Sequence, residues 1–374
     1  MIDFNRPHLT GNELKYIQQA VVDNLKISGN GEFTKKCQHF FEDRYGFKKC
    51  LLTTSCTDAL EMAAILCDIQ PGDEVIVPSY TFVSSALAFV RAGAKIVFAD
   101  SMERNPNIDA EKIEDLITPR TKVIVPVHYA GVACDMDRIM EIADRHGLLV
   151  VEDAAQAIDS YYKGRPLGSI GHFAAFSFHE TKNIIAGEGG LLVINDERFI
   201  RRAEIIWEKG TNRAEFFRGE VNKYGWCDTG SSFLPSEIIA AFLWAQLEQL
   251  EAIQDKRKAL WDQYYFGLKP LADKGLFCLP DIPNYATNNA HMFYLVCNSF
   301  EDRSGLIKSL KENHIQAVFH YLSLHSSPYY KSRHDGRNLP NCDRYADCLV
   351  RLPLFFNLNP SDISDICRFI ALWR

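Results

Sequence analysis

The chain has 374 residues, of which 47% are hydrophobic, and it carries a formal net charge of −7 at pH 7. This length is enough to bury a sizeable core and to form two domains, whereas the acidic balance argues against binding to the phosphate backbone of a nucleic acid. The first 15 residues lack the basic start and apolar stretch of a secretory signal, and no apolar run approaches the ~18 residues of a membrane span. We therefore expect a cytoplasmic protein without nucleic-acid or membrane partners.

Short apolar, β-branched runs alternate with amphipathic stretches from about residue 50 to 208, which is typical of a parallel sheet with crossover helices. Between two of these runs, residues 135–147 predict a helix with Asp135 as its N-cap and Gly147 at its end. The pattern predicts an α/β fold. The expected strands cover residues 50–53, 74–78, 95–99, 122–127, 148–152, 173–178 and 190–195.

The second half of the chain no longer shows this alternation of apolar runs and amphipathic stretches. Residues 210–235 predict a long irregular segment, which is uncommon unless the segment has a function. A largely buried helical region is expected from Ser236 to about Leu268, and the remaining residues mix strands such as MFYLVC and QAVFHY with amphipathic helices. We expect a large domain over residues 1–250 and a smaller C-terminal α/β domain over residues 251–374.

Polar and aromatic residues follow the predicted strands, in the stretches TSCTDAL, SYTFVSS, HYAG, EDAAQ and HETKN. Ligands of open parallel sheets bind outside the carboxyl ends of the strands. Lys182 follows the run FAAFSF by four residues and is therefore expected near that crevice. Burial there would lower the pKa of its ammonium group and free a lone pair for attack on a carbonyl or a cofactor aldehyde. For a lysine taken alone, a salt bridge or a loop contact is the alternative.

Asp153 ends the strand predicted before that of Lys182. Taken alone, it serves equally well as the N-cap of a following helix. Proteins bind pyridoxal phosphate (PLP) with two such groups. A lysine forms a Schiff base with it, and an aspartate holds the proton of its pyridinium nitrogen. The spacing between Asp153 and Lys182 leaves room for one crossover and one strand, so the pair predicts a PLP site.

Further side chains suit the same cofactor. Cys56 and Thr57 start a predicted helix, where backbone N–H groups bind phosphate, and Ser177 supplies a further hydroxyl. Phe82 would stack on a planar ring and Gln156 would hydrogen-bond a ring hydroxyl. Each feature has an ordinary alternative, namely a capped helix or core packing, but all of them agree with PLP.

The motifs PSYTFVSSA, VEDAAQA, FSFHETKNIIAGEGG and FHYLSLH resemble those of the DegT/DnrJ/EryC1/StrS sugar aminotransferases, of PLP fold type I, over essentially the whole chain. The resemblance implies a large domain with a mostly parallel sheet flanked by helices, and a smaller C-terminal α/β domain. It also implies that Lys182 bonds the cofactor and that Asp153 is the partner of the pyridinium nitrogen. The full set implied to hold PLP is Cys56, Thr57, Phe82, Asp153, Gln156, Ser177, Lys182 and Ser232.

One motif departs from the family. Many members carry G-x-N-x-R-M-S-E, whose Asn reaches the cofactor phosphate of the neighbouring subunit, whereas this chain has GSSFLPSE, with Ser232 in the Asn position and Leu234 in that of the Arg. The motif still implies a homodimer with active sites at the subunit interface. Members that dehydrate a sugar carbon have histidine in place of the lysine, so Lys182 implies transamination, with its amine as general base and acid.

The stretches IQPGDEVIVPSYTFVS, VIVPVHYAGVAC and FSFHETKN are most similar to the branch of the family that makes dTDP-4-amino-4,6-dideoxygalactose for enterobacterial common antigen. This implies amination of dTDP-4-keto-6-deoxyglucose at C4 by L-glutamate, with a galacto product. The gluco epimer, a 3-amino sugar and a non-catalytic PLP-binding regulator are the alternatives. His320, Tyr321 and Arg213 are the expected substrate contacts.

The sequence lacks the motifs of a nicotinamide dehydrogenase and of a metalloprotein. A nicotinamide dehydrogenase would share the alternating pattern, but no G-x-G-x-x-G follows the first predicted strand. His320 and His325 have no third metal ligand in register and the sequence has no H-E-x-x-H, so we expect no metal. The 11 cysteines include no C-x-x-C pair, and neither a zinc ribbon nor a disulfide framework is expected.

Overall fold

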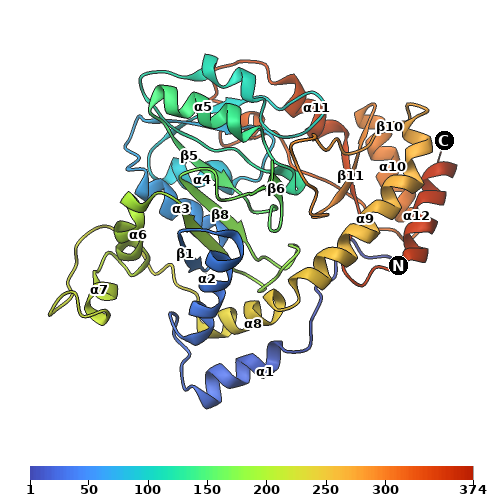
Figure 1. Cartoon of the computed structure of the whole chain (residues 1–374). Helices are drawn as coiled ribbons and strands as arrows, with labels where there is room; N and C mark the ends of the chain where they lie inside the picture. The colour runs from blue at the N-terminus through green and yellow to red at the C-terminus, as the bar shows by residue number, and fades with distance from the viewer. Residues whose placement is uncertain (374) are drawn as a thin grey trace.

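The computed structural model describes residues 1–373 and builds its larger sheet from seven strands. They are β1 (Lys49–Thr53), β2 (Glu74–Pro78), β3 (Lys95–Ala99), β4 (Thr121–Ile124), β5 (Leu149–Asp153), β8 (Phe173–Ser177) and β9 (Gly190–Ile194). Their order is β1-β9-β8-β5-β4-β2-β3, and β9 runs antiparallel to both of its neighbours while the other pairs are parallel. The predicted mostly parallel sheet is confirmed (Figure 1). The expected strands either agree with the observed bounds, as for β2 and β3, or differ only at their ends.

Helices cover both faces of this sheet. One face packs on α2 (Glu32–Tyr45), α5 (Met136–His146) and α8 (Glu237–Leu247), and the other on α3 (Cys56–Leu66), α4 (Ser84–Arg91) and α6 (Ile200–Trp207). Successive side chains of a strand point to opposite faces. Accordingly, Cys50 and Leu52 join the first core and Leu51 the second. A strand buried on both faces needs a continuous apolar run, which is why these strands were visible in the sequence.

Helix α5 ends as its sequence predicts. The Asp135 carboxylate accepts a hydrogen bond from the Arg138 backbone N–H at 3.4 Å, and Gly147 closes the helix with φ +65° in the left-handed region. Glycine populates that region without steric strain. The predicted cap and stop are confirmed.

A second, antiparallel sheet forms the C-terminal part of the chain. Its order is β10 (Phe277–Cys278), β11 (Phe293–Cys297), β13 (Leu349–Leu352) and β12 (Val318–Phe319). The long helix α9 (Leu250–Ala272) runs from beneath the larger sheet to this domain, where α10 (Phe300–Glu312), α11 (Pro340–Cys348) and α12 (Pro360–Leu372) lie (Figure 1). The single helical region expected from Ser236 is therefore two helices, α8 and α9. The domain boundary at residue 250 stays a prediction.

The N-terminal residues reach both parts of the molecule. Helix α1 (Glu13–Gln18) packs along α8, and Ile2 forms a parallel bridge with Ile315, just before β12. The segment between them therefore passes close to the C-terminal sheet. Among residues 1–373, no helix combines the length and the apolar character that crossing a membrane requires.

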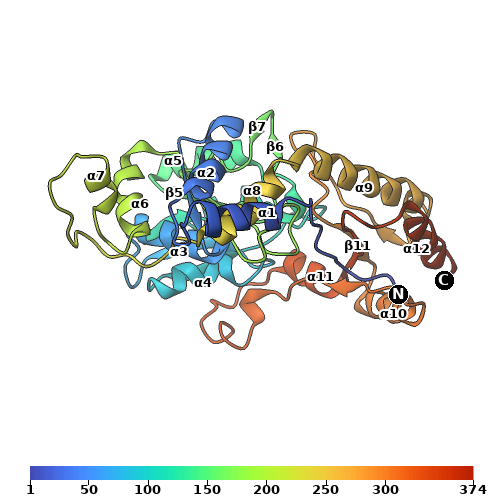
Figure 2. The same ribbon diagram turned by 90° about the horizontal axis from the view of Figure 1, so that it is seen from below.

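Residues 210–235 contain the short helix α7 (Arg213–Phe217) and otherwise turns and isolated bridges. In Figure 2 this region projects from the large domain at the end opposite to the C-terminal helices. Its aromatic side chains Phe217 and Trp226 are 68% and 87% exposed. The expected irregular segment is present, and it presents large apolar groups at the surface of a single chain.

Candidate active site

A cavity of about 450 Å³ lies where β1, β2, β5 and β8 end. It brings together nine of the eleven residues that the sequence indicated. From the large domain these are Cys56, Thr57, Phe82, Asp153, Gln156, Ser177 and Lys182, and from the C-terminal part His320 and Tyr321. The crevice at the carboxyl ends of the strands is thus closed on one side by the smaller domain.

Lys182 lies in the loop between β8 and β9, and its backbone N–H donates to the carbonyl of His179 at 2.9 Å. Burial in the cavity wall is the main cause that lowers the pKa of its ammonium group to about 8; Cys56 and Asp153 oppose the shift and Arg351 adds to it. At that pKa about 10% of the amine is neutral at pH 7, against roughly 0.03% for a lysine with pKa ~10.5. The loop therefore presents a usable lone pair.

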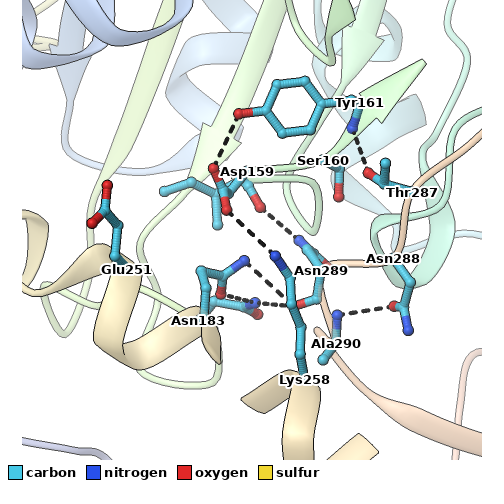
Figure 3. A network of polar contacts seen from close by, with 12 residues as sticks. Asp159, Ser160, Tyr161, Asn183, Glu251, Lys258, Thr287, Asn288, Asn289 and Ala290 are labelled. Carbon is cyan, nitrogen blue, oxygen red and sulfur yellow. Dashed lines mark hydrogen bonds and ion pairs between the residues drawn. The ribbon is translucent and has the colours of Figure 1, made fainter. Parts of the chain in front are cut away.

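The residue after Lys182 fixes this loop. The Asn183 side-chain amide donates to Gln254 Oε1 and to the carbonyl of Asn289, both at 2.8 Å, and its Oδ1 lies 2.9 Å from His291 Nδ1. Gln254 belongs to α9, and Asn289 and His291 lie in the segment that leads into β11. Figure 3 shows Asn183 beside Asn289. The position of Lys182 consequently depends on the packing of the C-terminal part against the large domain.

Asp153 is the last residue of β5, and its side chain faces the cavity with a total exposure of 5%. Its Oδ2 accepts from Ser85 Oγ at 2.6 Å and its Oδ1 from the Ala155 N–H at 3.1 Å. Residues 154–160 form turns, so the alternative role as a helix N-cap does not apply. The two hydrogen bonds hold the carboxylate in place, where it can accept the proton of a ring nitrogen.

The N-terminus of α3 forms another wall. Cys56 and Thr57 are its first two residues, so their N–H groups have no carbonyl one turn earlier in the helix, and the helix dipole adds positive potential there. Thr57 Oγ1 lies 2.8 Å from Ser84 Oγ. A Cβ atom at Gly190 would lie 2.3 Å from the carbonyl carbon of Ser55 and 2.5 Å from Cys56 N. Glycine is therefore required for β9 to start against this end of the helix.

Aromatic and imidazole side chains close the cavity on the side of the smaller domain. The rings of Phe82 and Tyr321 are 6.1 Å apart, and the Tyr321 hydroxyl accepts from Gln156 Nε2 at 3.0 Å. The His320 ring lies 3.5 Å from that of Tyr321, and its Nδ1 is 2.7 Å from the Tyr129 hydroxyl. Burial lowers the pKa of His320 well below its usual range, so this imidazole is neutral and suited to hydrogen-bonding rather than to ion pairing.

The cavity is also lined by residues that the sequence analysis did not single out, among them His291 and Arg351. Both come from the region of the C-terminal sheet, whose strands are antiparallel. The rule that ligands bind at the carboxyl ends of parallel strands therefore does not apply to them. Burial lowers the pKa of His291 well below its usual range. The signal for Arg351 was present, because an arginine interrupts the otherwise apolar strand LVRL.

Two predicted residues lie outside the cavity of their own chain. Ser232 is exposed and forms an isolated bridge with Glu208, and the Arg213 guanidinium is 3.9 Å from Glu208 Oε2 and 5.1 Å from the Phe217 ring. Their predicted roles stay predictions. His325, considered above as a metal ligand, has its Nδ1 2.8 Å from Ser79 Oγ, and among residues 1–373 no three His, Cys, Asp or Glu side chains are grouped to hold a metal ion.

Known proteins are similar to this chain in sequence and in architecture. The model of the DegT/DnrJ/EryC1/StrS aminotransferase family matches residues 7–371. The spore coat polysaccharide biosynthesis protein SpsC of Bacillus subtilis is 34% identical over 363 residues, which covers 94% of this chain and 92% of SpsC. GDP-perosamine synthase of Caulobacter vibrioides is 35% identical over 331 residues, covering 87% and 85% of the two chains. The PMP-form of Spr1654 from Streptococcus pneumoniae superposes with a TM-score of 0.92 at 25% identity, covering 100% and 99%.

Proposed function

The chain belongs to the DegT/DnrJ/EryC1/StrS aminotransferase family, and from this premise we propose that it transfers the amino group of L-glutamate to C4 of a nucleotide-linked 4-keto-6-deoxy sugar. It is a PLP-dependent sugar aminotransferase, and thus an enzyme rather than a non-catalytic binding protein. The observation that carries the proposal is the convergence of Lys182, Asp153 and the N-terminus of α3 on one cavity.

The cavity fits PLP by the chemistry of its walls. The Cys56 and Thr57 N–H groups suit the phosphate, the Asp153 carboxylate suits the ring nitrogen, and the Phe82 ring, which is 56% exposed and lines the cavity, suits the ring face. When bound, PLP supplies an aldehyde that an amine can bond and a ring that draws electrons from that amine. We assign the covalent attachment to Lys182.

The remaining polar side chains have roles that follow from their places. Ser177 ends β8 and offers its hydroxyl to the phosphate, while Gln156, held by Tyr321, is placed for the ring hydroxyl. His320 and Tyr321 lie on the side of the smaller domain, where they would bind hydroxyl groups of the sugar. Asp153 would hold the proton on the ring nitrogen of bound PLP, since a carboxylate beside the ring favours its charged form.

Lys182 is the proposed acid and base. Transamination requires that a proton leave the α-carbon of glutamate and that a proton reach C4 of the sugar. An amine with a pKa of about 8 is present in both its neutral and its charged form near neutral pH, which suits both transfers. The Asn183 contacts hold the loop that carries Lys182 at the cavity wall.

We also propose that two copies complete each site. Residues 210–235 project from the large domain with exposed aromatic side chains, and Ser232 and Arg213 in this segment do not reach their own cavity. A segment of this kind would be covered by a second copy. The exposed Trp226 is then expected at the contact.

The proposed substrate is dTDP-4-keto-6-deoxyglucose and the product its 4-amino galacto derivative, for a surface glycan such as O-antigen or enterobacterial common antigen. Similarity to a spore coat polysaccharide protein and to a GDP-perosamine synthase supports a nucleotide sugar on the way to a polysaccharide. The gluco epimer and a 3-amino sugar follow from the same site with the sugar bound in another orientation.

The test is to incubate the enzyme with dTDP-4-keto-6-deoxyglucose, L-glutamate and PLP, and to read the proton couplings of the product at H4. A small H3–H4 coupling supports the galacto product, and a large one indicates gluco. Product without an amine at C4 contradicts the proposal. A parallel incubation with Lys182→Ala should give no product, and a GDP-linked keto sugar tests the nucleotide.

A further inference from the structure

Asn289 is fully buried in the segment that precedes β11, and it does not line the cavity. Its side-chain amide donates two hydrogen bonds, to the carbonyls of Gln156 and Ile158, both at 2.8 Å. Its Oδ1 accepts from the His291 N–H at 3.0 Å, and its backbone carbonyl accepts from Asn183 Nδ2 at 2.8 Å. Both polar atoms of the side chain therefore have partners, as a buried amide requires.

These hydrogen bonds connect two loops of the active site. Gln156 and Ile158 belong to the turns at 154–160, which follow Asp153 at the end of β5. Asn183 comes directly after Lys182 in the loop between β8 and β9. Figure 3 shows Asn289 between Asn183 and the turns at 159–160. One residue outside the cavity thus binds both of the loops that supply its reactive groups.

The turn at Gly131 leaves the space that this amide fills. A Cβ atom at Gly131 would lie 2.0 Å from Asn289 Oδ1. The same turn holds the loop after β5, because the Ala130 N–H donates to Gln156 Oε1 and Ser160 Oγ donates to the Gly131 carbonyl, both at 2.6 Å. Gln156 is therefore fixed through its side chain by Ala130 and through its backbone carbonyl by Asn289.

The backbone of Asn289 is fixed as well. The next residue, Ala290, has φ +52°, a left-handed conformation that is unfavourable for a residue with a Cβ atom. Its N–H donates to Asn288 Oδ1 at 2.9 Å, and its carbonyl accepts from Arg257 Nε at 3.1 Å. Such a conformation persists only where surrounding contacts determine it. The carbonyl that Asn183 uses consequently has a fixed direction.

We propose that Asn289 is a positioning residue that sets the place of Lys182 relative to Asp153 and Gln156. The inference rests on the proposed function, in which these three side chains act on one PLP ring. Groups that act on one molecule must be placed accurately, since a displacement of about 1 Å can cost about 100-fold in rate. Asn289 would supply that accuracy without touching the cofactor.

The alternative is that Asn289 serves only the stability of the fold, and Asn195 offers a matched comparison. Asn195 Nδ2 also donates to two carbonyls, those of Gly168 and Gly171, at 2.7 and 2.9 Å. It follows Ile194, which pairs with the first residues of β1 and β8, so it lies at the edge of the sheet opposite to the cavity. Asn195→Ala removes the same two donations as Asn289→Ala, but far from Lys182.

The amine of Lys182 reports its own position in the apoprotein. Competitive acetylation at several pH values, followed by mass spectrometry, gives the pH at which half of this amine is neutral. In the wild type we expect a midpoint near pH 8, because burial lowers the pKa of Lys182 to about 8. Asn289→Ala should raise the midpoint by about one pH unit, since a loosened loop admits water and water favours the charged amine. Asn195→Ala should keep the midpoint of the wild type.

PLP binding gives a second readout. Titration followed by absorbance should show a dissociation constant about 10-fold higher for Asn289→Ala, and within about 2-fold of the wild type for Asn195→Ala. If both variants unfold at lower urea concentrations while the Lys182 midpoint and the PLP affinity stay unchanged, Asn289 is only structural and the proposal is overturned. If PLP in the wild type is bonded to another lysine, the proposed function fails, while acetylation of the apoprotein still tests Asn289.

A measurement on the wild type covers the case in which Asn289→Ala does not fold. A residue that strengthens PLP binding is itself held more firmly when PLP is bound, because coupling between two sites is reciprocal. Residues 284–290 do not line the cavity. Their hydrogen exchange should nevertheless slow by about 10-fold when PLP binds the apoprotein. Exchange in this segment that PLP leaves unchanged would overturn the proposal.

Discussion

Gly190 makes possible the close approach of β9 to the start of α3, and Gly190→Ala tests whether that approach creates the phosphate site. The added Cβ would lie 2.3 Å from Ser55 C, 2.4 Å from Ser55 O and 2.5 Å from Cys56 N, all of which are backbone atoms. No side chain can rotate away to relieve these contacts. Helix α3 must therefore move relative to β9.

The size of that movement sets the expected effect. An ordinary contact begins near 3.4 Å, so the N-terminus of α3 has to shift by about 1 Å from its present position. Such overpacking destabilises by about 1–3 kcal/mol. A hydrogen bond of ~2.9 Å that lengthens by this amount is lost. One charge-assisted bond is worth about 1.5–3 kcal/mol, so the dissociation constant of PLP should rise by about 10- to 150-fold.

Gly189→Ala is the matched control, because its Cβ would meet only Ala186 Cβ at 3.4 Å, Phe178 Cβ at 3.5 Å and Ile239 Cγ2 at 3.7 Å. Both variants would be titrated with PLP by absorbance, and the unfolding of both apoproteins would be followed by circular dichroism. We predict weak PLP binding for Gly190→Ala and near wild-type binding for Gly189→Ala. Equal affinities in the two variants would refute the placing of the phosphate at α3.

Three further predictions address other parts of the site. Asp153→Asn should still bind PLP, since an amide can keep the Ser85 contact. It should slow the glutamate half-reaction by about 10³-fold, because a neutral amide does not stabilise the charged ring. Near-normal turnover of this variant would assign the role to another group. Lys182, with a pKa of about 8 in the folded state, binds fewer protons than in the unfolded chain between pH 8 and 10.5, so the apoprotein should gain stability across this window. Urea unfolding at several pH values should show the excess stability of Lys182→Met shrinking over the same range, and a constant difference would contradict the shift. Trp226→Glu should shift sedimentation towards monomer with loss of turnover, whereas a fully active monomer would argue against the dimer.

The larger sheet was predictable because its strands are buried on both faces. EVIVP and KIVFA are apolar after their first residue, and their bounds, 74–78 and 95–99, agree with β2 and β3. The C-terminal domain was less visible. The expected strand runs MFYLVC and QAVFHY contain β11 and β12, but β10 has only two residues, too few to show a period. The break between α8 and α9 was not predicted, because apolar residues at helical spacing continue from Leu247 to Leu250 on either side of it.

The part of the site built on strand ends could be predicted for the same reason. Asp153 and Lys182 follow parallel strands, and topology brings such residues to one edge of the sheet. Arg351 and His291 reach the cavity from a separate antiparallel sheet, and their placement depends on how the two parts pack. The Asn183 contacts that join these parts are hydrogen bonds between residues far apart in the chain, and no local sequence pattern predicts them.

Borohydride reduction of the holoenzyme followed by peptide mapping tests most directly whether this cavity holds PLP on Lys182. Reduction fixes the cofactor to the amine that it bonds, and mass spectrometry of the digest locates the added phosphopyridoxyl group. We predict the modification on the peptide that contains Lys182 and its absence from Lys182→Ala. A phosphopyridoxyl group on any other lysine of the wild-type chain would contradict the account.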